Sequence, residues 1–199
     1  CDEESFLRRF IDDIAEAGCR TVIIHARKAW LAGLSPKENR EIPPLNYPLV
    51  HAIVREHPEL SIVINGGFSD LDQVSEQWAH CSGVMLGRAV YDNPWLLAGV
   101  DPLLGDAIPP PSDRLAVIDA MRPYIERETK AGTPLHCITR HMLGLYKGLP
   151  GARGYRRVLS ESARAKGAGL EVIDAALREI ATVTTTEFPS QPITSEVHR

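Results

Sequence analysis

Three short apolar runs, each followed by a turn and then by a helical pattern, constrain the fold of this chain most strongly. The runs are Thr21–Ile24, Ser61–Asn65 and Gly83–Leu86. Consecutive apolar positions are typical of parallel strands that helices cover. The intervening patterns predict helices over residues 5–17, 48–57, 69–80 (capped by Ser69) and 89–97. The order α-β-α-β-α-β-α predicts strands buried on both faces, in part of an eight-stranded (β/α)8 TIM barrel or of a doubly wound sheet.

The second part of the chain follows a different pattern. A proline-rich stretch, 105–112, predicts a semi-rigid linker because a proline run cannot continue a helix. It separates a partial α/β barrel, 1–104, from an all-α helical-bundle domain, 113–183. Helices are expected in that domain over residues 113–131, 134–148, 151–166 and 170–183. The tail 184–199 is rich in Thr, Ser and Pro, and we expect it to be disordered.

Charge is distributed unevenly along the 199 residues. The formal net charge is -4, and residues 1–106 hold 9 Lys and Arg against 16 Asp and Glu. Residues 140–166 hold 7 Lys and Arg against one acid, Glu161. A local basic block on an acidic chain indicates a polyanionic partner, and the alternative is a solvated helix face.

The four cysteines lie far apart and form no C-x-x-C pair, which predicts reduced thiols and no metal site. The sequence contains no membrane-length apolar run and no signal peptide. We therefore expect a cytoplasmic protein without a membrane partner. Cys1 stands in place of an initiator Met, just before a helix, so the chain is expected to begin inside a larger domain.

Polar residues and glycines follow each predicted strand. In a barrel these residues gather at one rim, where phosphate sites are common. Glycines let the backbone approach a ligand, and a guanidinium grips phosphate in a bidentate manner. A histidine there would donate to phosphate or to a flavin-type ring. The predicted phosphate site comprises His25, Asn65, Gly66, Gly67, Gly87 and Arg88. The alternative is that the glycines only make tight turns and that His25 is a hydrogen-bonded core residue.

Five segments resemble one family, the tRNA-dihydrouridine synthases, and within it the A subfamily. The segments are His25–Leu45, Ile64–Gly67, Gly83–Arg88, Ile138–Tyr146 and Gly151–Glu161. The likeness covers about residues 5–165 and concerns the C-terminal part of the family's chain. It implies a barrel that holds FMN, followed by a helical domain that helps to hold RNA.

The resemblance also implies an activity. Family members use FMN and NADPH to reduce the 5,6 double bond of uridines in the tRNA D-loop. By the matching motifs, the six residues of the predicted phosphate site would contact FMN. The target base must leave its stack, so the enzyme must hold the tRNA backbone by charge. The resemblance supports Lys37, Arg40, Arg153 and Arg156 as tRNA contacts, whereas Arg157, Arg164 and Lys166 are equally consistent with a solvated surface.

The chain departs from the family pattern in one respect. The family's proton-donating cysteine lies in a motif like N-x-G-C-P, which is absent from this sequence. We therefore expect no catalytic residue here and an inactive chain when it is alone. Without the N-terminal part of the family's barrel, the outer strands of this sheet would have unpaired edges. Unpaired edges favour self-association, and the sequence does not specify an oligomeric state.

Two other functions are consistent with the sequence. A non-catalytic RNA-binding module would explain the basic block and the missing cysteine motif. A flavin barrel acting on a small molecule, such as a dihydroorotate or enoate reductase, would explain the glycine turns, but it leaves the basic helices and the 25–45 segment unexplained.

Overall fold

The computed structural model describes residues 3–28, 30, 33–105 and 109–187, with side chains described to residue 181. The chain divides into two compact units, Cys1–Val90 and Tyr91–Arg199, which we call unit 1 and unit 2. The division falls earlier than the expected boundary at residue 104. Part of the expected linker, residues 106–108, lies outside the described residues.

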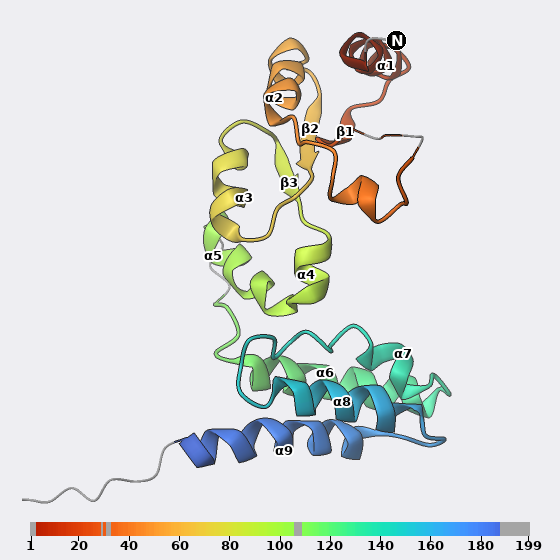
Figure 1. The fold of residues 1–199 in the computed structure, drawn as a ribbon, viewed down its shortest axis with the longest axis vertical. Helices are drawn as coiled ribbons and strands as arrows, with labels where there is room; N and C mark the ends of the chain where they lie inside the picture. Colours follow the sequence, from red (N-terminus) through yellow and green to blue (C-terminus); the bar gives the residue numbers. More distant parts are fainter. Residues whose placement is uncertain (1–2, 29, 31–32, 106–108, 188–199) are drawn as a thin grey trace, which may run out of the picture. The chain divides into compact units, whose positions relative to one another are not determined.

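Unit 1 contains the three predicted strands, which form one parallel sheet in the order β1-β2-β3 (Figure 1). Its elements are α1 (Glu3–Glu16), β1 (Thr21–His25), the 3₁₀ turn η1 (Glu38–Arg40), α2 (Tyr47–Glu56), β2 (Ser61–Asn65), α3 (Leu71–Trp78), β3 (Gly83–Met85) and α4 (Arg88–Asp92), which runs on past residue 90. This arrangement is an α/β fold consistent with a partial TIM barrel. Asp70, rather than the expected Ser69, caps α3, because its carboxylate accepts from the Gln73 N–H at 2.9 Å.

Among the residues that the structure describes, helices cover one face of the sheet of unit 1. Ile24, Ile62 and Ile64 are buried on that face. The opposite face carries Ile23, which is 56% exposed, and Met85, which is 42% exposed. The expectation that the strands are buried on both faces was therefore wrong. Its physical reason is that the core packs α1 and α2 against the same side of the sheet, and three strands do not close a barrel around the other side.

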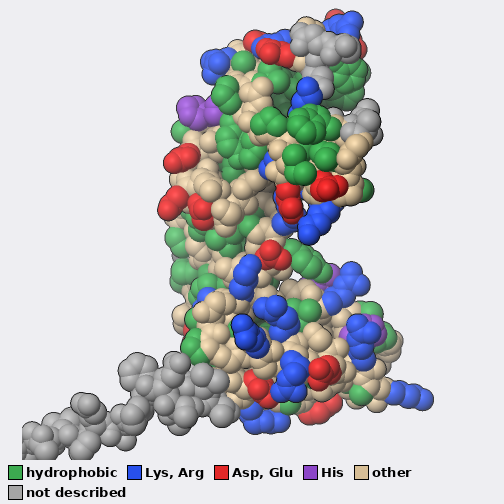
Figure 2. All heavy atoms as spheres, viewed as in Figure 1, with side chains coloured by type: hydrophobic (Ala, Val, Ile, Leu, Met, Phe, Trp, Pro, Cys, Tyr) green, Lys and Arg blue, Asp and Glu red, His purple; other side chains and the backbone are tan. Residues whose placement is uncertain are grey.

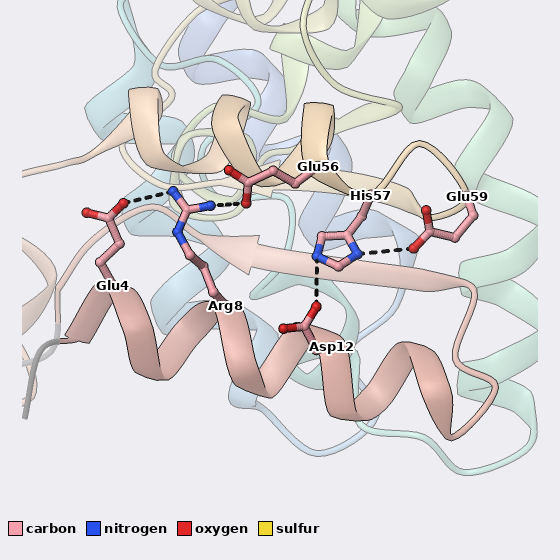
Figure 3. A network of polar contacts seen from close by, with 6 residues as sticks. All are labelled: Glu4, Arg8, Asp12, Glu56, His57 and Glu59. Carbon is pink, nitrogen blue, oxygen red and sulfur yellow. Dashed lines mark hydrogen bonds and ion pairs between the residues drawn. The ribbon is translucent and has the colours of Figure 1, made fainter.

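Six polar side chains tie α1 to the end of α2 and the turn after it: Glu4, Arg8, Asp12, Glu56, His57 and Glu59 (Figure 3). Arg8 contacts Glu56 and lies 2.8 Å from the Glu4 carboxylate in its own helix. The two ring nitrogens of His57 face Asp12 at 3.4 Å and Glu59 at 3.1 Å. Exposed ion pairs each contribute about 0–1 kcal/mol. These contacts therefore align α1, while burial of apolar side chains such as Ile11 holds it on the sheet.

Unit 2 is helical, with a separate apolar core (Figure 1). Its elements are η2 (Pro94–Gly99), α5 (Val100–Leu104), α6 (Arg114–Lys130), α7 (Leu135–Thr139), α8 (Ala152–Glu161), η3 (Ser162–Arg164) and α9 (Leu170–Glu187). Tyr155 of α8 lies fully buried in this core with Ile173 of α9. Burial raises the pKa of the Tyr155 hydroxyl, and Tyr146 adds to that effect. None of the helices in the described part of the chain has the length and hydropathy needed to cross a membrane.

Residues 91–104 pack with unit 2, which explains the early division. The Tyr91 hydroxyl lies 3.0 Å from Nδ1 of His141, and the Arg114 guanidinium lies 4.6 Å from the centre of the Trp95 ring. The backbone of Asp92 leaves no room for a side chain at Gly144. These contacts join positions far apart in the sequence. The proline-rich composition of residues 105–112, from which the domain boundary was predicted, therefore gave no sign of them.

Several helix boundaries differ from the expectation. The helix expected over 89–97 is divided into α4 and η2, and the one expected over 151–166 ends at Glu161. The helix expected over 134–148 ends at Thr139, and the residues after it form turns with short-range bonds, such as Lys147 N–H to the Gly144 carbonyl at 2.9 Å. At the other end, α9 continues to Glu187. The expectation of disorder was therefore wrong for residues 184–187, and residues 188–199 lie outside the described part.

The one-sided core of unit 1 predicts a sharp contrast between two isoleucines. Ile62→Ala removes a fully buried side chain from the central strand, and we expect the free energy of unfolding to fall by about 2–5 kcal/mol. Ile23→Ala, on the exposed face, is expected to cost less than about 1 kcal/mol. Equilibrium unfolding in urea measures both values. Equal losses would show that the exposed face is covered in solution.

Candidate functional site

The carboxyl ends of the three strands bring together the polar residues that the sequence singled out. His25 and Asn65 are direct partners in the register of β1 and β2, and Asn65 is in turn the partner of Met85 in β3. The ladder continues one step further, because the Ala26 N–H donates to the Asn65 carbonyl at 2.8 Å. Arg88 begins α4 three residues after β3, close enough for its charge to act on His25. His25 and Asn65 therefore lie side by side at the carboxyl end of the sheet, and Arg88 lies in the segment that follows β3.

Arg27 has a structural role that the sequence did not reveal. Its Nη1 donates to the Glu41 carbonyl at 3.0 Å and to the Pro43 carbonyl, while its backbone pairs with Leu45. Its Nε is buried without a hydrogen-bond partner. Arg27 thus fastens the end of the long 26–46 loop against the strand that precedes the loop. Its spacing from these carbonyls, 14 and 16 residues, is too long for local pattern reading.

Arg88 is held by the same loop. Its Nη1 donates to the Glu41 carboxylate at 3.3 Å, and its Nη2 donates to the Arg40 carbonyl at 3.1 Å. Both members of the Arg88–Glu41 pair are more than half exposed, so the pair contributes little stability. A guanidinium has five N–H donors, so others remain for an anion. The contact also places η1, with the exposed side chains of Lys37 and Arg40, beside the strand ends.

The glycines after β2 are required by packing within the chain. Gly66 and Gly67 have φ values of 128° and 79°, which favour glycine. A Cβ at Gly66 would lie 3.0 Å from Leu45 Cδ2, and one at Gly67 would lie 2.6 Å from Leu45 Cδ1. The Tyr47 hydroxyl donates to the Gly66 carbonyl at 2.6 Å. For these two glycines the tight-turn alternative accounts for the residue type, whereas a Cβ at Gly87 would meet no atom within 4 Å.

His25 is presented as a neutral donor. Its pKa is lowered from the ordinary value of 6.5 by burial first and then by the charges of Arg27 and Arg88. The Arg27 N–H donates to Nδ1 at 3.2 Å, so in the neutral ring the proton resides on Nε2. The residue as a whole is exposed, so the burial that lowers its pKa is only partial and leaves the ring accessible. His25 can therefore donate one hydrogen bond from Nε2 to a ligand beside Arg88.

A cavity of about 430 Å³ adjoins this edge on the side of α1 and α2. His25, Arg27 and Lys28 line it, but Asn65 and Arg88 do not. The predicted cluster and the cavity are therefore neighbouring features that share His25. Among the described side chains, no group of three or more His, Cys, Asp or Glu could hold a metal ion.

Basic side chains gather on the visible face of unit 2 (Figure 2). Arg153 and Arg156 lie three residues apart on α8 and are both exposed, so they share one side of the helix. Neither forms an ion pair with a described residue. Arg157, by contrast, lies 3.3 Å from Glu179 and 3.8 Å from Glu161. The structure thus separates two arginines without an ion pair to a described residue from a paired one. Of the two partners of Arg157, Glu161 lies four residues on in the sequence, whereas Glu179 belongs to another helix.

Comparisons with known proteins give a consistent match. Residues 1–181 match the family described as dihydrouridine synthase (Dus). A tRNA-dihydrouridine(20/20a) synthase of Shewanella oneidensis is 52% identical over 181 residues, which cover 91% of this chain and 54% of the relative. Proteins of the same name from Vibrio cholerae and Salmonella typhimurium are each 52% identical, over 90% of this chain and 55% and 54% of their own lengths. The chain spans about half the length of the curated relatives it matches.

The environment of His25 gives a prediction that needs no ligand. Arg88→Met removes one of the two cations that disfavour its protonation, so the pKa of His25 should rise toward 6.5. In the unsubstituted chain the folded state binds this proton less readily than the unfolded state. Protonation of His25 therefore favours the unfolded state, and the free energy of unfolding decreases as the pH falls below 6.5.

An NMR titration of the His25 ring protons measures the shift. Arg20→Met is the matched control, because Arg20 precedes the opposite end of β1 and its guanidinium donates to the Ala15 and Cys19 carbonyls. An unchanged His25 pKa in Arg88→Met would show that the two side chains are apart in solution.

Proposed function

The chain belongs to the dihydrouridine synthase family, and on that premise we propose that it supplies the phosphate-binding edge and the RNA-binding helices of a tRNA-dihydrouridine synthase of the A subfamily. The observation that carries the proposal is the convergence of His25, Asn65 and Arg88 at one edge of the sheet. The relatives are named as synthases acting at positions 20 and 20a of tRNA, and we propose the same D-loop uridines for the whole protein. Unit 1 would then be the C-terminal part of the family's barrel.

The residues at the strand ends fit the phosphate of FMN. Arg88 has donors to spare, His25 offers Nε2–H, and Asn65 lies beside His25 in the register. The open space at Gly87 admits a group close to the backbone. We propose His25, Asn65, Gly87 and Arg88 as the direct contacts, with Gly66 and Gly67 shaping the turn. These residues would hold FMN, which would supply hydride chemistry for the reduction of the uracil ring, with NADPH as the reductant.

The chain's own residues bind and orient the two large ligands. His25 stays neutral near pH 7 because burial and two guanidinium groups lower its pKa, and it therefore donates a hydrogen bond without adding charge. Arg88 balances the phosphate charge while Glu41 keeps its side chain oriented. The proton that completes the reduction comes from outside this sequence, which has no N-x-G-C-P motif. We propose no catalytic residue here and no turnover by the chain alone.

The RNA contacts are proposed in each unit separately. Lys37 precedes the short turn η1 and Arg40 is its last residue, beside the strand ends, and Arg153 and Arg156 lie on α8. Unpaired exposed guanidinium groups are free to neutralise phosphates, and release of the counterions drives binding. A cytoplasmic enzyme that takes one base out of its stack needs such a grip on the surrounding backbone.

One other function is favoured by a specific observation. The two unpaired arginines of α8, together with the missing cysteine motif, would also suit a non-catalytic RNA-binding module derived from the same enzyme. The two functions differ in their need for flavin, because only the synthase requires FMN at the strand ends.

The flavin assignment is tested by titration of the chain with FMN. We expect Arg88→Ala to weaken FMN binding by roughly tenfold or more, because a charge-assisted bond contributes about 1.5–3 kcal/mol. Arg20→Ala, at the other end of β1, should bind like the unsubstituted chain. In the whole protein, FMN and NADPH should convert uridine to dihydrouridine in unmodified tRNA. Failure of both flavin binding and turnover would leave the RNA-binding module.

The RNA assignment is tested by the dependence of tRNA binding on salt. Arg153→Ala with Arg156→Ala removes two proposed phosphate contacts, so the slope of log affinity against log salt should decrease by about 1.5. Arg157→Ala on the same helix is the control, because its guanidinium is already paired. A double variant with the slope of the unsubstituted chain would contradict the assignment of α8.

A further inference from the structure

A cavity in unit 2 is lined by none of the residues proposed above as FMN or tRNA contacts. Its volume is about 570 Å³ and it lies between the end of α6, the start of α7 and the turn after η3. Buried Leu135 and Ala163 anchor the two segments that form its walls. Pockets that hold small ligands have volumes of about 300–1,000 Å³, so the space suffices for a phosphate with its attached sugar.

The charges that line the cavity are of one sign. Lys130, Arg164 and Lys166 line it, and no carboxylate side chain is among its described lining residues. Arg164 and Lys166 form no ion pair with any residue that the structure describes. Lys130 lies 3.6 Å from Glu126, but both side chains are about half exposed or more, so that pair is weak. Three cations that line one cavity, two of them without an ion pair to a described residue, favour an anionic ligand.

The first acidic residue after Lys166, Glu171, is already hydrogen-bonded to the backbone. The Glu171 carboxylate accepts from the Gly169 N–H at 2.7 Å, at the start of α9. The turn that presents Lys166 depends on Gly167, whose φ is 79° and whose Cβ position is open. The backbone therefore holds the acid near the helix start and the cations on the cavity wall.

His136 supplies a second kind of observation. It lines the same cavity, and its Nδ1 is buried without a hydrogen-bond partner. Its Nε2 faces the Cys137 thiol at 3.6 Å, a weak contact. A buried polar atom without a partner is unfavourable, so Nδ1 is a candidate to bond a ligand in the cavity.

We propose that this cavity binds one backbone phosphate of tRNA through Lys130, Arg164 and Lys166, with His136 as the neighbouring donor. The inference rests on the proposed function, since tRNA is its ligand, and it adds a contact distinct from those of Arg153 and Arg156. A phosphodiester is the expected form, and free inorganic phosphate carries the same oxyanion chemistry.

The test compares two double variants with the same change of charge. Arg164→Ala with Lys166→Ala should reduce the salt slope of tRNA binding by about 1.5 and weaken binding alike for different tRNAs. Arg127→Ala with Arg157→Ala removes two cations that face Glu128, Glu161 and Glu179, and its slope should stay within about 0.5 of the unsubstituted value. The charge-preserving exchange Arg164→Lys with Lys166→Arg should restore the slope.

A titration with inorganic phosphate tests whether the cavity binds free phosphate instead of a phosphodiester of tRNA. Followed by the ring signals of His136, phosphate should bind weakly to the unsubstituted chain, and tRNA should displace it. Tight phosphate binding that tRNA does not displace would overturn the inference, as would an unchanged slope in the Arg164 and Lys166 variant or an equal fall in the control variant. If the unsubstituted chain bound no tRNA, the proposed function would fail first, and this inference with it.

Discussion

The in-register pairing of three parallel strands is the constraint on which the rest of unit 1 depends. Burial of Ile24, Ile62 and Ile64 on one face fixes the register, because a slip by one residue would turn these side chains to the other face. The same register places His25 beside Asn65. Packing of the apolar core therefore also brings these polar residues together, and no further interaction is needed to place them side by side.

The long loop after β1 converts that edge into a fixed arrangement of charges. Arg27 binds two carbonyls near the far end of the loop, Leu45 fills the space over the glycines after β2, and Glu41 reaches Arg88 after β3. One segment thus contacts the ends of all three strands. The pKa of His25 reports this arrangement, because both cations that help to lower it are held by the loop.

Local sequence patterns were sufficient for the strands and for most helices, since apolar runs and helical periodicity depend on neighbouring residues. They also placed His25, Asn65 and Arg88 at one edge, because parallel strands end on the same side. They failed where distant contacts decide. The packing of Tyr91 and Trp95 with residues 114–144 moved the division between units, and the carbonyls that bind Arg27 lie 14 and 16 residues away. The difference between Arg156 and Arg157 depends in part on Glu179 of another helix, beside the local pair of Arg157 with Glu161.

The uncovered face of the sheet has a thermodynamic consequence. Ile23 and Met85 are already exposed to water in the folded state. Unfolding of unit 1 therefore exposes less additional apolar surface than unfolding of a domain whose sheet is covered on both faces. The heat-capacity increment of unfolding should then fall below the usual value of about 12–15 cal/mol/K per residue. Its stability curve would be correspondingly flat, changing little between cold and warm conditions.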